Sequence, residues 1–272
     1  MKVGYQGVSG AFSDMAVRKY FKGQEYEEVS YADFVSMFKD VESGAIDYAM
    51  FPVENTTTGI IARTYDHFQN YDIHIVGETV VPIKECLIVL PGTEIEDIKE
   101  VYSHPEALNQ CQEIFEKYPY MRACVYEDTA LSVSYIKEKG DKSKAALASE
   151  LAAEIYGMEI LERQVQDNNV NMTRFLCLTN KDDYPEYADK VSIRMVTSHT
   201  PGALYNALGI FASFGINVLR LESRPIVGRI FDYCFYLDFA GNLKDANVQE
   251  ALRRLEYDCI ELNVFGNYKE YR

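Results

Sequence analysis

The sequence predicts an α/β protein with two parts. In the first part, short apolar runs of strand length alternate with stretches whose apolar residues have helical spacing, which is typical of β–α units. The second part has the order strand, helix, strand, strand, helix, strand, which is the ferredoxin-like plan. A polar stretch with one proline, residues 181–186, separates the two parts and has the composition of a linker. We therefore predict a first domain over residues 1–181 and a second over 187–272.

The first part contains two clear helix starts and one pair of long extended runs. Thr129 and Ser149 precede helical stretches and are good N-caps. Residues 73–81 and 84–90 are extended runs separated by Pro82, and we interpret them as a crossover between two lobes with a cleft between them. Strands are predicted at 3–6, 26–29, 46–53, 73–81, 84–90, 101–102, 123–126 and 145–148, and helices at 13–21, 31–41, 59–68, 105–118, 129–137 and 149–156.

The second part has equally clear boundaries. Thr200 as N-cap with Pro201 at the first helical position marks a helix start, and Gly228 between two β-rich runs indicates a hairpin. Pro225 inside a strand indicates an edge strand or a bulge. Strands are predicted at 191–196, 216–227, 229–239 and 259–265, and helices at 201–214 and 244–255.

The composition excludes several classes of protein. Apolar residues make up 47% of the 272 residues and charged residues 25%, so the chain can bury a core and is not of the disordered class. The net charge of −15 is uneven: residues 1–185 carry 17 Lys/Arg against 31 Asp/Glu, and residues 186–272 carry 10 against 11. An acidic first part repels nucleic acid and anionic membranes. An anionic substrate therefore needs a local site of cations, helix N-termini and amide donors.

The chain has the features of a cytoplasmic protein without a metal site. No apolar run approaches the roughly 20 residues that span a bilayer, and the N-terminus resembles no signal segment. The six cysteines are scattered without a CxxC, so we interpret them as reduced core residues. The four histidines have no metal-ligand spacing, and we expect no metal and no cofactor. His104, before Pro105, is either a packing or capping residue or a proton carrier.

Residues 171–175, Asn-Met-Thr-Arg-Phe, are the most informative motif. They place a hydroxyl donor, Thr173, beside a fixed cation, Arg174, and an aromatic ring, Phe175, at the start of an apolar run. That set suits a site that holds a small anion and gives it a hydrogen bond. Taken alone, the same residues also fit a strand start with a capping threonine and a surface arginine.

Two other segments have the same character. Residues 52–59, Pro-Val-Glu-Asn-Thr-Thr-Thr-Gly, follow a buried strand, and we expect them to open a helix and form an anion cradle around Asn55 and Thr56. In the second segment Ser103 can cap a helix that starts at Pro105 and carries Gln110 two turns on. An ordinary turn and a plain cap are the alternatives. The glycine-rich loop 4–13 matches neither GxGxxG nor GxxxxGK[ST], which argues against a nucleotide site.

Taken together, these segments resemble the monofunctional prephenate dehydratases over nearly the whole chain. The matching residues are Gly4–Ser13, Pro52–Asn55, Gly59, Ser103–Pro105 with Gln110 and Cys111, Asn171, Thr173–Phe175, Gly202–Leu204 and Glu222–Pro225. The chain departs from the family where Thr56 stands in place of a frequent serine, and where Gly241-Asn242 replaces a Gly-His pair.

The resemblance implies a function and a set of site residues. It implies that Thr173 is the essential catalytic residue, and that Asn55, Thr56, Ser103, Gln110, Arg174 and Phe175 bind the substrate. It implies a catalytic domain that resembles a two-lobed periplasmic binding protein, followed by an ACT domain. In that domain, the phenylalanine effector site at a dimer interface is implied at Gly202, Ala203, Leu204, Glu222, Ser223, Arg224 and Pro225.

The implied reaction converts prephenate to phenylpyruvate, with loss of carbon dioxide and hydroxide. We expect Thr173 to donate a hydrogen bond to the departing oxygen and Arg174 to grip a carboxylate through its two-pronged fork. Asn55, Ser103 and Gln110 are expected to donate to the other carboxylate or the ring hydroxyl. Arogenate is the rival substrate, and a non-catalytic amino-acid sensor is the rival class of function. We expect a homodimer or homotetramer that binds neither nucleic acid nor membrane.

Overall fold

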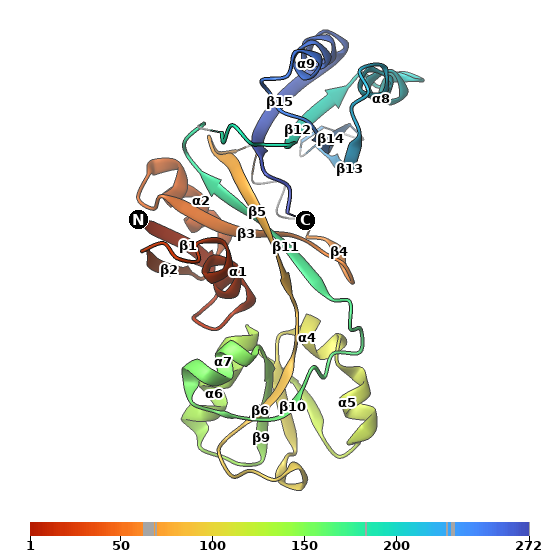
Figure 1. The fold of residues 1–272 in the computed structure, drawn as a ribbon. Helices are drawn as coiled ribbons and strands as arrows, with labels where there is room; N and C mark the ends of the chain where they lie inside the picture. Colours follow the sequence, from red (N-terminus) through yellow and green to blue (C-terminus); the bar gives the residue numbers. More distant parts are fainter. Residues whose placement is uncertain (62–67, 69, 183, 227, 230–231, 272) are drawn as a thin grey trace. The chain divides into compact units, whose positions relative to one another are not determined.

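The computed structural model describes residues 1–61, 68, 70–182, 184–226, 228–229 and 232–271. The predicted α/β class is confirmed, and the elements follow the predicted alternation (Figure 1). The chain divides into two compact units. The first comprises Met1–Thr64 and Thr79–Phe175, and the second comprises Tyr65–Glu78 and Leu176–Arg272. The division thus falls inside two long strands, β5 (His74–Pro82) and β11 (Met172–Thr179), and not at the linker.

The first lobe of the first unit is a parallel β–α sheet. Strand β1 pairs in parallel with β2 on one side and β3 on the other, and β11 follows β3 in the order β2-β1-β3-β11. Its elements are β1 (Lys2–Gln6), α1 (Phe12–Tyr20), β2 (Glu27–Tyr31), α2 (Phe34–Ser43), β3 (Tyr48–Asn55) and β4 (Gly59–Ile60).

The second lobe is a sheet of order β10-β6-β9-β7-β8 with helices on both faces. Its elements are β6 (Cys86–Val89), η1 (Ile95–Asp97), β7 (Glu100–Ser103), α4 (Pro105–Asn109), α5 (Gln112–Lys117), β8 (Arg122–Val125), α6 (Thr129–Lys139), β9 (Lys144–Ala148), α7 (Glu150–Tyr156) and β10 (Glu159–Arg163). Alternate residues of β6 and β9 face opposite sides. Cys86 and Ile88 pack with α6 and α7, whereas Leu87 and Val89 pack with α4 and α5 (Figure 1).

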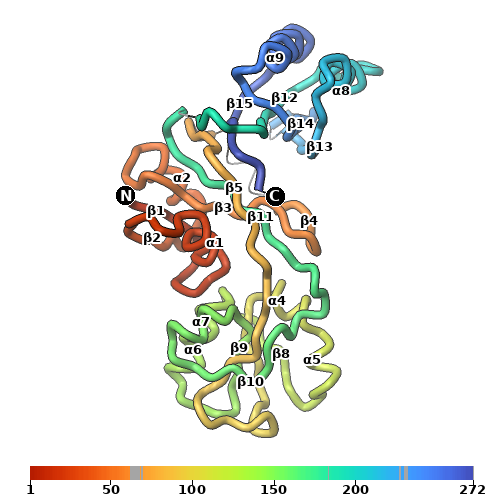
Figure 2. The backbone as a smooth tube through the Cα atoms, in the orientation of Figure 1, coloured from red at the N-terminus to blue at the C-terminus, as the bar shows by residue number. Residues whose placement is uncertain are grey.

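The chain passes between the two lobes twice, after β5 and after β10 (Figure 2). The two passages are bonded to each other: the Ile83 N–H donates to the Asn171 carbonyl at 2.8 Å, and the Val165 N–H donates to the Glu85 carbonyl at 2.9 Å. The predicted crossover between two lobes is therefore confirmed. The second passage and strand β10, which leads into it, were missed, because residues 157–170 have little apolar periodicity.

The glycine-rich loop after β1 packs against the other lobe. Gly10 has φ +93°, and a Cβ there would lie 2.8 Å from the Cα of Ala152 on α7. The Ser149 hydroxyl donates to the Gly10 carbonyl at 2.6 Å. This loop therefore needs glycine for close packing between the lobes.

The second unit carries the predicted ferredoxin-like plan. Its elements are β12 (Lys190–Thr197), α8 (Ala203–Ser213), β13 (Val218–Pro225), β14 (Tyr233–Ala240), α9 (Ala246–Asp258) and β15 (Cys259–Tyr268). The antiparallel order is β13-β14-β12-β15, so β13 is the edge strand that Pro225 predicted. Helices α8 and α9 share one apolar core with the sheet. Residue Gly266 of β15 also pairs in parallel with Ile75 of β5.

Several predicted element boundaries are wrong, each for a local reason. Residues 59–60 form a strand, so segment 52–59 opens a hairpin and no helix; the rest of the helix predicted over 59–68 lies largely outside the described residues. The N-cap of α6 is Asp128, whose carboxylate accepts from the Ala130 and Leu131 N–H groups, and not Thr129. Helix α8 begins at Ala203 after Gly202 (φ +85°), and not after Thr200. Ser149 caps α7 as predicted.

None of the helices in the described parts of the chain is long and apolar enough to cross a membrane. All six cysteines are free, and Cys86, Cys111, Cys177 and Cys234 are buried, as expected of reduced core residues.

Candidate active site

A cavity of about 370 Å³ lies between the two lobes of the first unit. Its walls come from the segments that follow the carboxyl ends of β1, β3, β7 and β8, which is where parallel α/β sheets place their ligands. Strand β11 adds one wall. The polar lining residues are Gln6, Ser13, Asn55, Thr58, Glu85, His104, Glu106, Gln110, Glu127, Asp128, Thr129 and Thr173.

Four side chains in this region form a hydrogen-bonded chain. The Asn55 amide donates to the Thr173 hydroxyl at 3.0 Å and to the Asn171 side-chain oxygen at 2.7 Å. The Asn171 amide in turn donates to the Gln110 side-chain oxygen at 2.7 Å. Asn55, Asn171 and Thr173 are 7%, 2% and 7% exposed. The chain thus links β3, β11 and α4 through groups that are shielded from bulk water.

The backbone next to Asn55 fixes the donor and acceptor of every hydrogen bond in this chain of side chains. The Asn55 side-chain oxygen accepts from the Thr57 and Thr58 N–H groups at 2.8 and 3.0 Å, so the amide nitrogen must face Thr173. Thr173 is therefore an acceptor from Asn55, and its own proton has no acceptor among the described residues. Gln110 likewise accepts from Asn171, which leaves its amide protons available. The cavity is consequently supplied with a hydroxyl donor and an amide donor.

Gln110 is positioned by a break in the helix predicted over 105–118, which the sequence pattern did not show. The predicted helix 105–118 is divided into α4 and α5 at Gln110 and Cys111. Asp167, from the second passage between lobes, causes the break: its carboxylate accepts from the Gln112 and Glu113 N–H groups, and its own N–H donates to the Gln110 carbonyl. Because α4 ends at this point, Gln110 lies at a helix end beside the cavity and not on a helix face.

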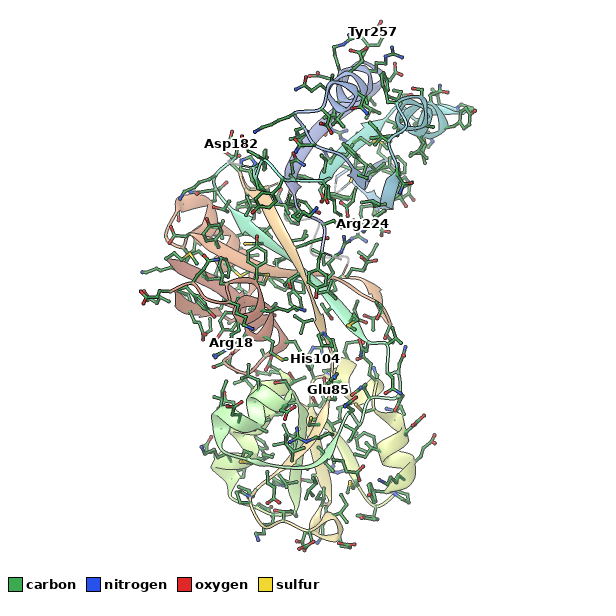
Figure 3. The ribbon with its side chains drawn as sticks, viewed as in Figure 1. Arg18, Glu85, His104, Asp182, Arg224 and Tyr257 are labelled. Carbon is green, nitrogen blue, oxygen red and sulfur yellow. The ribbon has the colours of Figure 1, made fainter. Side chains whose placement is uncertain are left out.

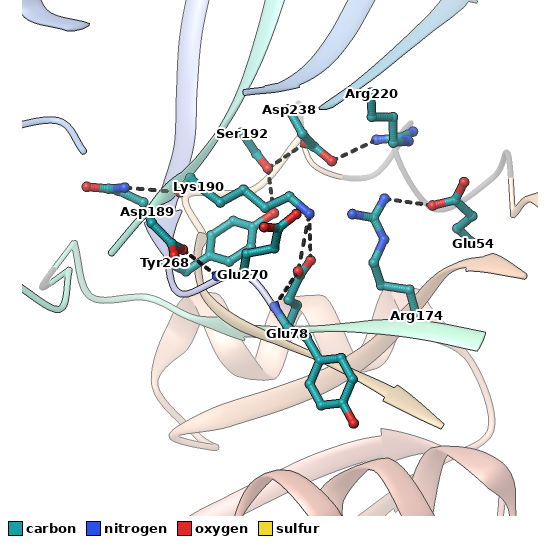
Figure 4. A network of polar contacts seen from close by, with 12 residues as sticks. Glu54, Glu78, Arg174, Asp189, Lys190, Ser192, Arg220, Asp238, Tyr268 and Glu270 are labelled. Carbon is teal, nitrogen blue, oxygen red and sulfur yellow. Dashed lines mark hydrogen bonds and ion pairs between the residues drawn. The ribbon is translucent and has the colours of Figure 1, made fainter. Parts of the chain in front are cut away.

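Three predicted substrate contacts lie outside the cavity lining. Arg174 follows Thr173 on a strand, so it points to the opposite face of the sheet, where it pairs with Glu54 at 2.8 Å (Figure 4). The Thr56 hydroxyl donates to the Val170 carbonyl and accepts from the Met172 N–H. The Ser103 hydroxyl is fully buried and donates to the Leu147 carbonyl.

Of the predicted residues, the structure brings Thr173, Asn55, Gln110 and Phe175 to the cavity. His104, not Ser103, caps α4, because its Nδ1 accepts from the Glu106 N–H at 3.2 Å. Its ring nevertheless borders the cavity. Helix α1 begins at the cavity without a side-chain cap, so its first N–H groups add anion-binding donors.

Glu85 was not predicted from the sequence. It lines the cavity but is 1% exposed, and its Oε2 has no hydrogen-bond partner among the described residues. Burial, with a smaller contribution from the nearby Asp128 charge, raises the pKa of the Glu85 carboxyl to about 8. One signal was visible: an acidic residue directly before the apolar run Cys86–Leu90. Thr58 and Asn171 lie in the predicted motifs 52–59 and 171–175 but were not singled out as site residues.

The predicted effector residues lie on two elements of the second unit. Gly202, Ala203 and Leu204 stand at the start of α8, where Ala203 and Leu204 border a surface hollow together with residues 197–201. Glu222–Pro225 form the end of the edge strand β13 and are not among the residues that line that hollow. In the described part of the chain, no group of three or more His, Cys, Asp or Glu side chains could hold a metal ion.

The family model described as prephenate dehydratase matches residues 3–183. The chain belongs to the prephenate dehydratase family. The motifs at 52–59, 103–110 and 171–175 therefore predicted the family correctly, and its members are carbon–oxygen lyases. The cavity described above lies wholly within residues 3–183.

Three proteins with marked similarity to this chain have different descriptions. The arogenate dehydratase/prephenate dehydratase 2 of Arabidopsis thaliana is 38% identical over 98% of this chain and 72% of its own length. A crystal structure of prephenate dehydratase from Arthrobacter aurescens in complex with L-phenylalanine is 29% identical, with a TM-score of 0.91 over 99% of this chain and 90% of that one. The structure of GqqA, described as a quorum-quenching acylase, is 30% identical. Its TM-score is 0.91 over 100% of this chain and 98% of that one.

Proposed function

We propose that this chain is a prephenate dehydratase of L-phenylalanine biosynthesis, which converts prephenate to phenylpyruvate. The observation that supports this most directly is the oriented chain from the Thr57 and Thr58 N–H groups through Asn55 to Thr173. It leaves the Thr173 proton available to the cavity, and a hydroxyl that donates is what departure of the substrate oxygen requires.

The chemistry explains why one donor matters. Loss of carbon dioxide and hydroxide makes the ring of prephenate aromatic, so the barrier lies in expelling a poor leaving group. A preorganised donor that is aimed at the oxygen where charge develops is worth about 10²–10³-fold in rate. A threonine hydroxyl is too weak an acid to give up its proton freely. Thr173 therefore holds the departing oxygen by a hydrogen bond.

The carboxylates of the substrate bind to neutral donors. Arg174 lies on the other face of the sheet, and none of the described lining residues is a lysine or an arginine. The Gln110 amide, the Ser13 and Thr129 hydroxyls and the first N–H groups of α1 supply donors instead.

Arogenate is the second candidate substrate, and one observation favours it. The carboxylates of Glu106, Glu127 and Asp128 border the cavity, and Glu106 and Glu127 are exposed. Arogenate carries an ammonium group where prephenate carries a keto group, and these carboxylates attract a cation. Comparison of kcat/KM on the two compounds decides between them.

The two other classes of function have less support. An acylase, as GqqA is described, is the first of these classes, and covalent acyl transfer needs a nucleophile activated by a base. Thr173 is hydrogen-bonded to an amide, and none of the described lining residues pairs a hydroxyl with a histidine or lysine. A non-catalytic sensor would bind its ligand through the same donors without forming phenylpyruvate, so an assay for that product separates the sensor from the enzyme.

Thr173→Val tests the main proposal. We expect kcat on prephenate to fall about 10²–10³-fold, because valine keeps the shape and removes the donor. Thr173→Ser should retain near-normal turnover. The matched control is Thr93→Val, which removes a buried hydroxyl that is bonded to the Leu90 carbonyl and lies outside the cavity lining. Formation of phenylpyruvate is followed by ultraviolet absorbance, and a fully active Thr173→Val enzyme would contradict the proposal.

The regulatory part of the proposal concerns the second unit. We assign residues 187–272 as an ACT domain whose Gly202–Leu204 and Glu222–Pro225 segments bind phenylalanine between subunits of a homodimer or homotetramer in the cytoplasm. The phenylalanine complex of the Arthrobacter aurescens relative supports this assignment. Gly202 has φ +85°, so Gly202→Val strains the start of α8. The full-length variant should need more phenylalanine for half-maximal inhibition, and an unchanged inhibition curve would count against the site.

A further inference from the structure

The cavity contains a second group that can donate a proton, the carboxyl of Glu85. This residue stands between β5 and β6, where the chain first passes between the lobes (Figure 3). It borders the same cavity as Thr173 and His104. Neither carboxyl oxygen makes a hydrogen bond with any of the described residues, and Oε2 is completely buried. An unpartnered polar group at this depth is rare in folded proteins, and a catalytic role is one of the recognised reasons for it.

The backbone holds Glu85 in place from both sides. Its N–H donates to the Gln166 side-chain oxygen at 3.0 Å, and its carbonyl accepts from the Val165 N–H at 2.9 Å. Gln166 is itself buried. Because both passages between the lobes take part, Glu85 cannot move away from the cavity wall without breaking the connection between them.

The surroundings of Glu85 keep it protonated. A buried carboxylate without a partner is costly, and the charge of Asp128 adds repulsion. No lysine or arginine is among the described residues that line the cavity with it. A protonated carboxyl has an O–H donor, and among the described residues no acceptor is available to it. The titratable groups around it, on every packed element, are Asp128 and Glu127 before α6, His104 and Glu106 at α4, Cys86 on β6, Cys111 before α5 and Asp167 on the second passage.

We propose that Glu85 is the general acid that protonates the departing hydroxyl of the substrate. This role rests on the proposed function. The bond between the ring and its carboxylate breaks and releases carbon dioxide, and the electron pair of that bond enters the ring. The ring C–O bond breaks, its electron pair leaves with the oxygen, and the oxygen takes the proton of Glu85 and departs as water. Solvent then reprotonates the Glu85 carboxylate, while Thr173 holds the oxygen by its hydrogen bond.

Rate measurements over the neutral and alkaline range test this role. The acid form of Glu85 is the active form, so kcat of the wild type should fall as pH rises through the pKa of about 8. Glu85→Gln keeps a neutral donor of the same shape but cannot transfer a proton. We expect its kcat to be lower by about 10²–10⁴-fold, with little change in KM and without the alkaline fall. Asp128→Asn keeps the cap of α6, removes the neighbouring charge and should move the alkaline fall to lower pH.

Controls separate this role from a structural one. Glu154→Gln, on the exposed face of α7, should reproduce the wild-type profile. The infrared band of a protonated carboxyl should be present in the wild type at neutral pH and lost in Glu85→Gln, which checks the protonation state of the folded protein independently of turnover.

Two outcomes would overturn the role of Glu85. The first is a Glu85→Gln enzyme with wild-type kcat and an unchanged alkaline fall, while the wild type is active; this refutes the general acid and leaves the proposed function intact. The second is a wild-type enzyme that is inactive on both prephenate and arogenate, which refutes the proposed function and this role together. A Glu85→Gln variant whose kcat is lower and no longer decreases at alkaline pH supports the role.

Discussion

Glu78 in the second unit and Glu85 in the first are both buried glutamates, 6% and 1% exposed, but their carboxyl groups have different surroundings. The oxygens of Glu78 lie 2.9 and 3.2 Å from the Nζ of Lys190, and one also accepts from the Tyr271 N–H (Figure 4). The oxygens of Glu85 have no hydrogen-bond partner in the described part of the chain.

The difference separates a carboxylate that is held within the fold from a carboxyl that can donate a proton. A buried ion pair with added hydrogen bonds offsets the loss of hydration and needs nothing from outside the protein. A buried carboxyl without a partner becomes neutral and offers a proton to whatever enters. Burial alone therefore does not identify a functional acid; the absence of a partner next to a cavity does.

The largest expected effect comes from removing the cation that pairs with Glu78. Lys190→Met leaves Glu78 buried without its cation, and removal of one partner of a buried pair costs about 3–5 kcal/mol of unfolding free energy. Urea unfolding measures this loss.

The double variant Lys190→Met/Glu78→Leu is the control for this prediction. It removes both charges, so it should recover most of the lost stability, since hydrophobic replacement of a buried pair is often neutral. If the single variant were as stable as the wild type, Glu78 would not be held by Lys190 as described.

The second prediction concerns the contribution of Glu85 to stability and its dependence on pH. Its folded-state pKa of about 8 lies above the ordinary 4.5, so the protonated form stabilises the fold, and that stability is lost as pH rises from 4.5 through 8. Each unit of pKa difference is worth about 1.4 kcal/mol, which makes the total a few kcal/mol. Glu85→Gln avoids this loss. Its melting temperature relative to the wild type should rise across that range and then level off, and a constant difference would show that Glu85 ionises normally.

Much of the fold was predictable because local patterns determine it. The alternation of strand and helix signals, the crossover around Pro82 and the βαββαβ order after residue 186 are all present in the structure. The errors came from long-range partners. Asp167 divides the helix at Gln110 from more than 50 residues away. The threonines after Asn55 form a hairpin because Thr56 bonds to Val170, just before β11, and to Met172 at its start.

The site was predictable in part, and Arg174 shows why. Thr173, Asn55, Gln110 and Phe175 reach the cavity, but neighbouring residues on a strand point to opposite faces, so Thr173 and Arg174 could not both do so. This alternation was readable from the sequence. The position of Glu85 was not, because its neutral state depends on which side chains surround it after two passages of the chain come together.

The third prediction concerns Asn171, which orients its two hydrogen-bond partners in the donor chain, as Lys190 orients Glu78. It accepts from Asn55 and donates to Gln110, so Asn171→Ala frees both side chains to turn. We expect kcat on prephenate to fall about 10²-fold, the loss that a misplacement of about 1 Å can cause. Asn168→Ala, an exposed asparagine of the same segment, is the matched control. A variant in which KM rose and kcat did not change would indicate that the hydrogen-bonded side chains bind substrate without orienting Thr173.

The smallest effect is expected from carboxylates of a third kind, the exposed Glu106 and Glu127 at the cavity. Water solvates them, so they act only through their charge, and each exposed interaction is worth about a two- to fivefold change in rate. Glu106→Gln and Glu127→Gln should raise kcat/KM for prephenate and lower it for arogenate, because the carboxylates repel the first and attract the ammonium of the second. Added salt should reduce the difference, and Glu116→Gln, exposed on α5 outside the cavity lining, should leave it unchanged. Equal changes on both substrates would mean that these glutamates shape the cavity and do not select by charge.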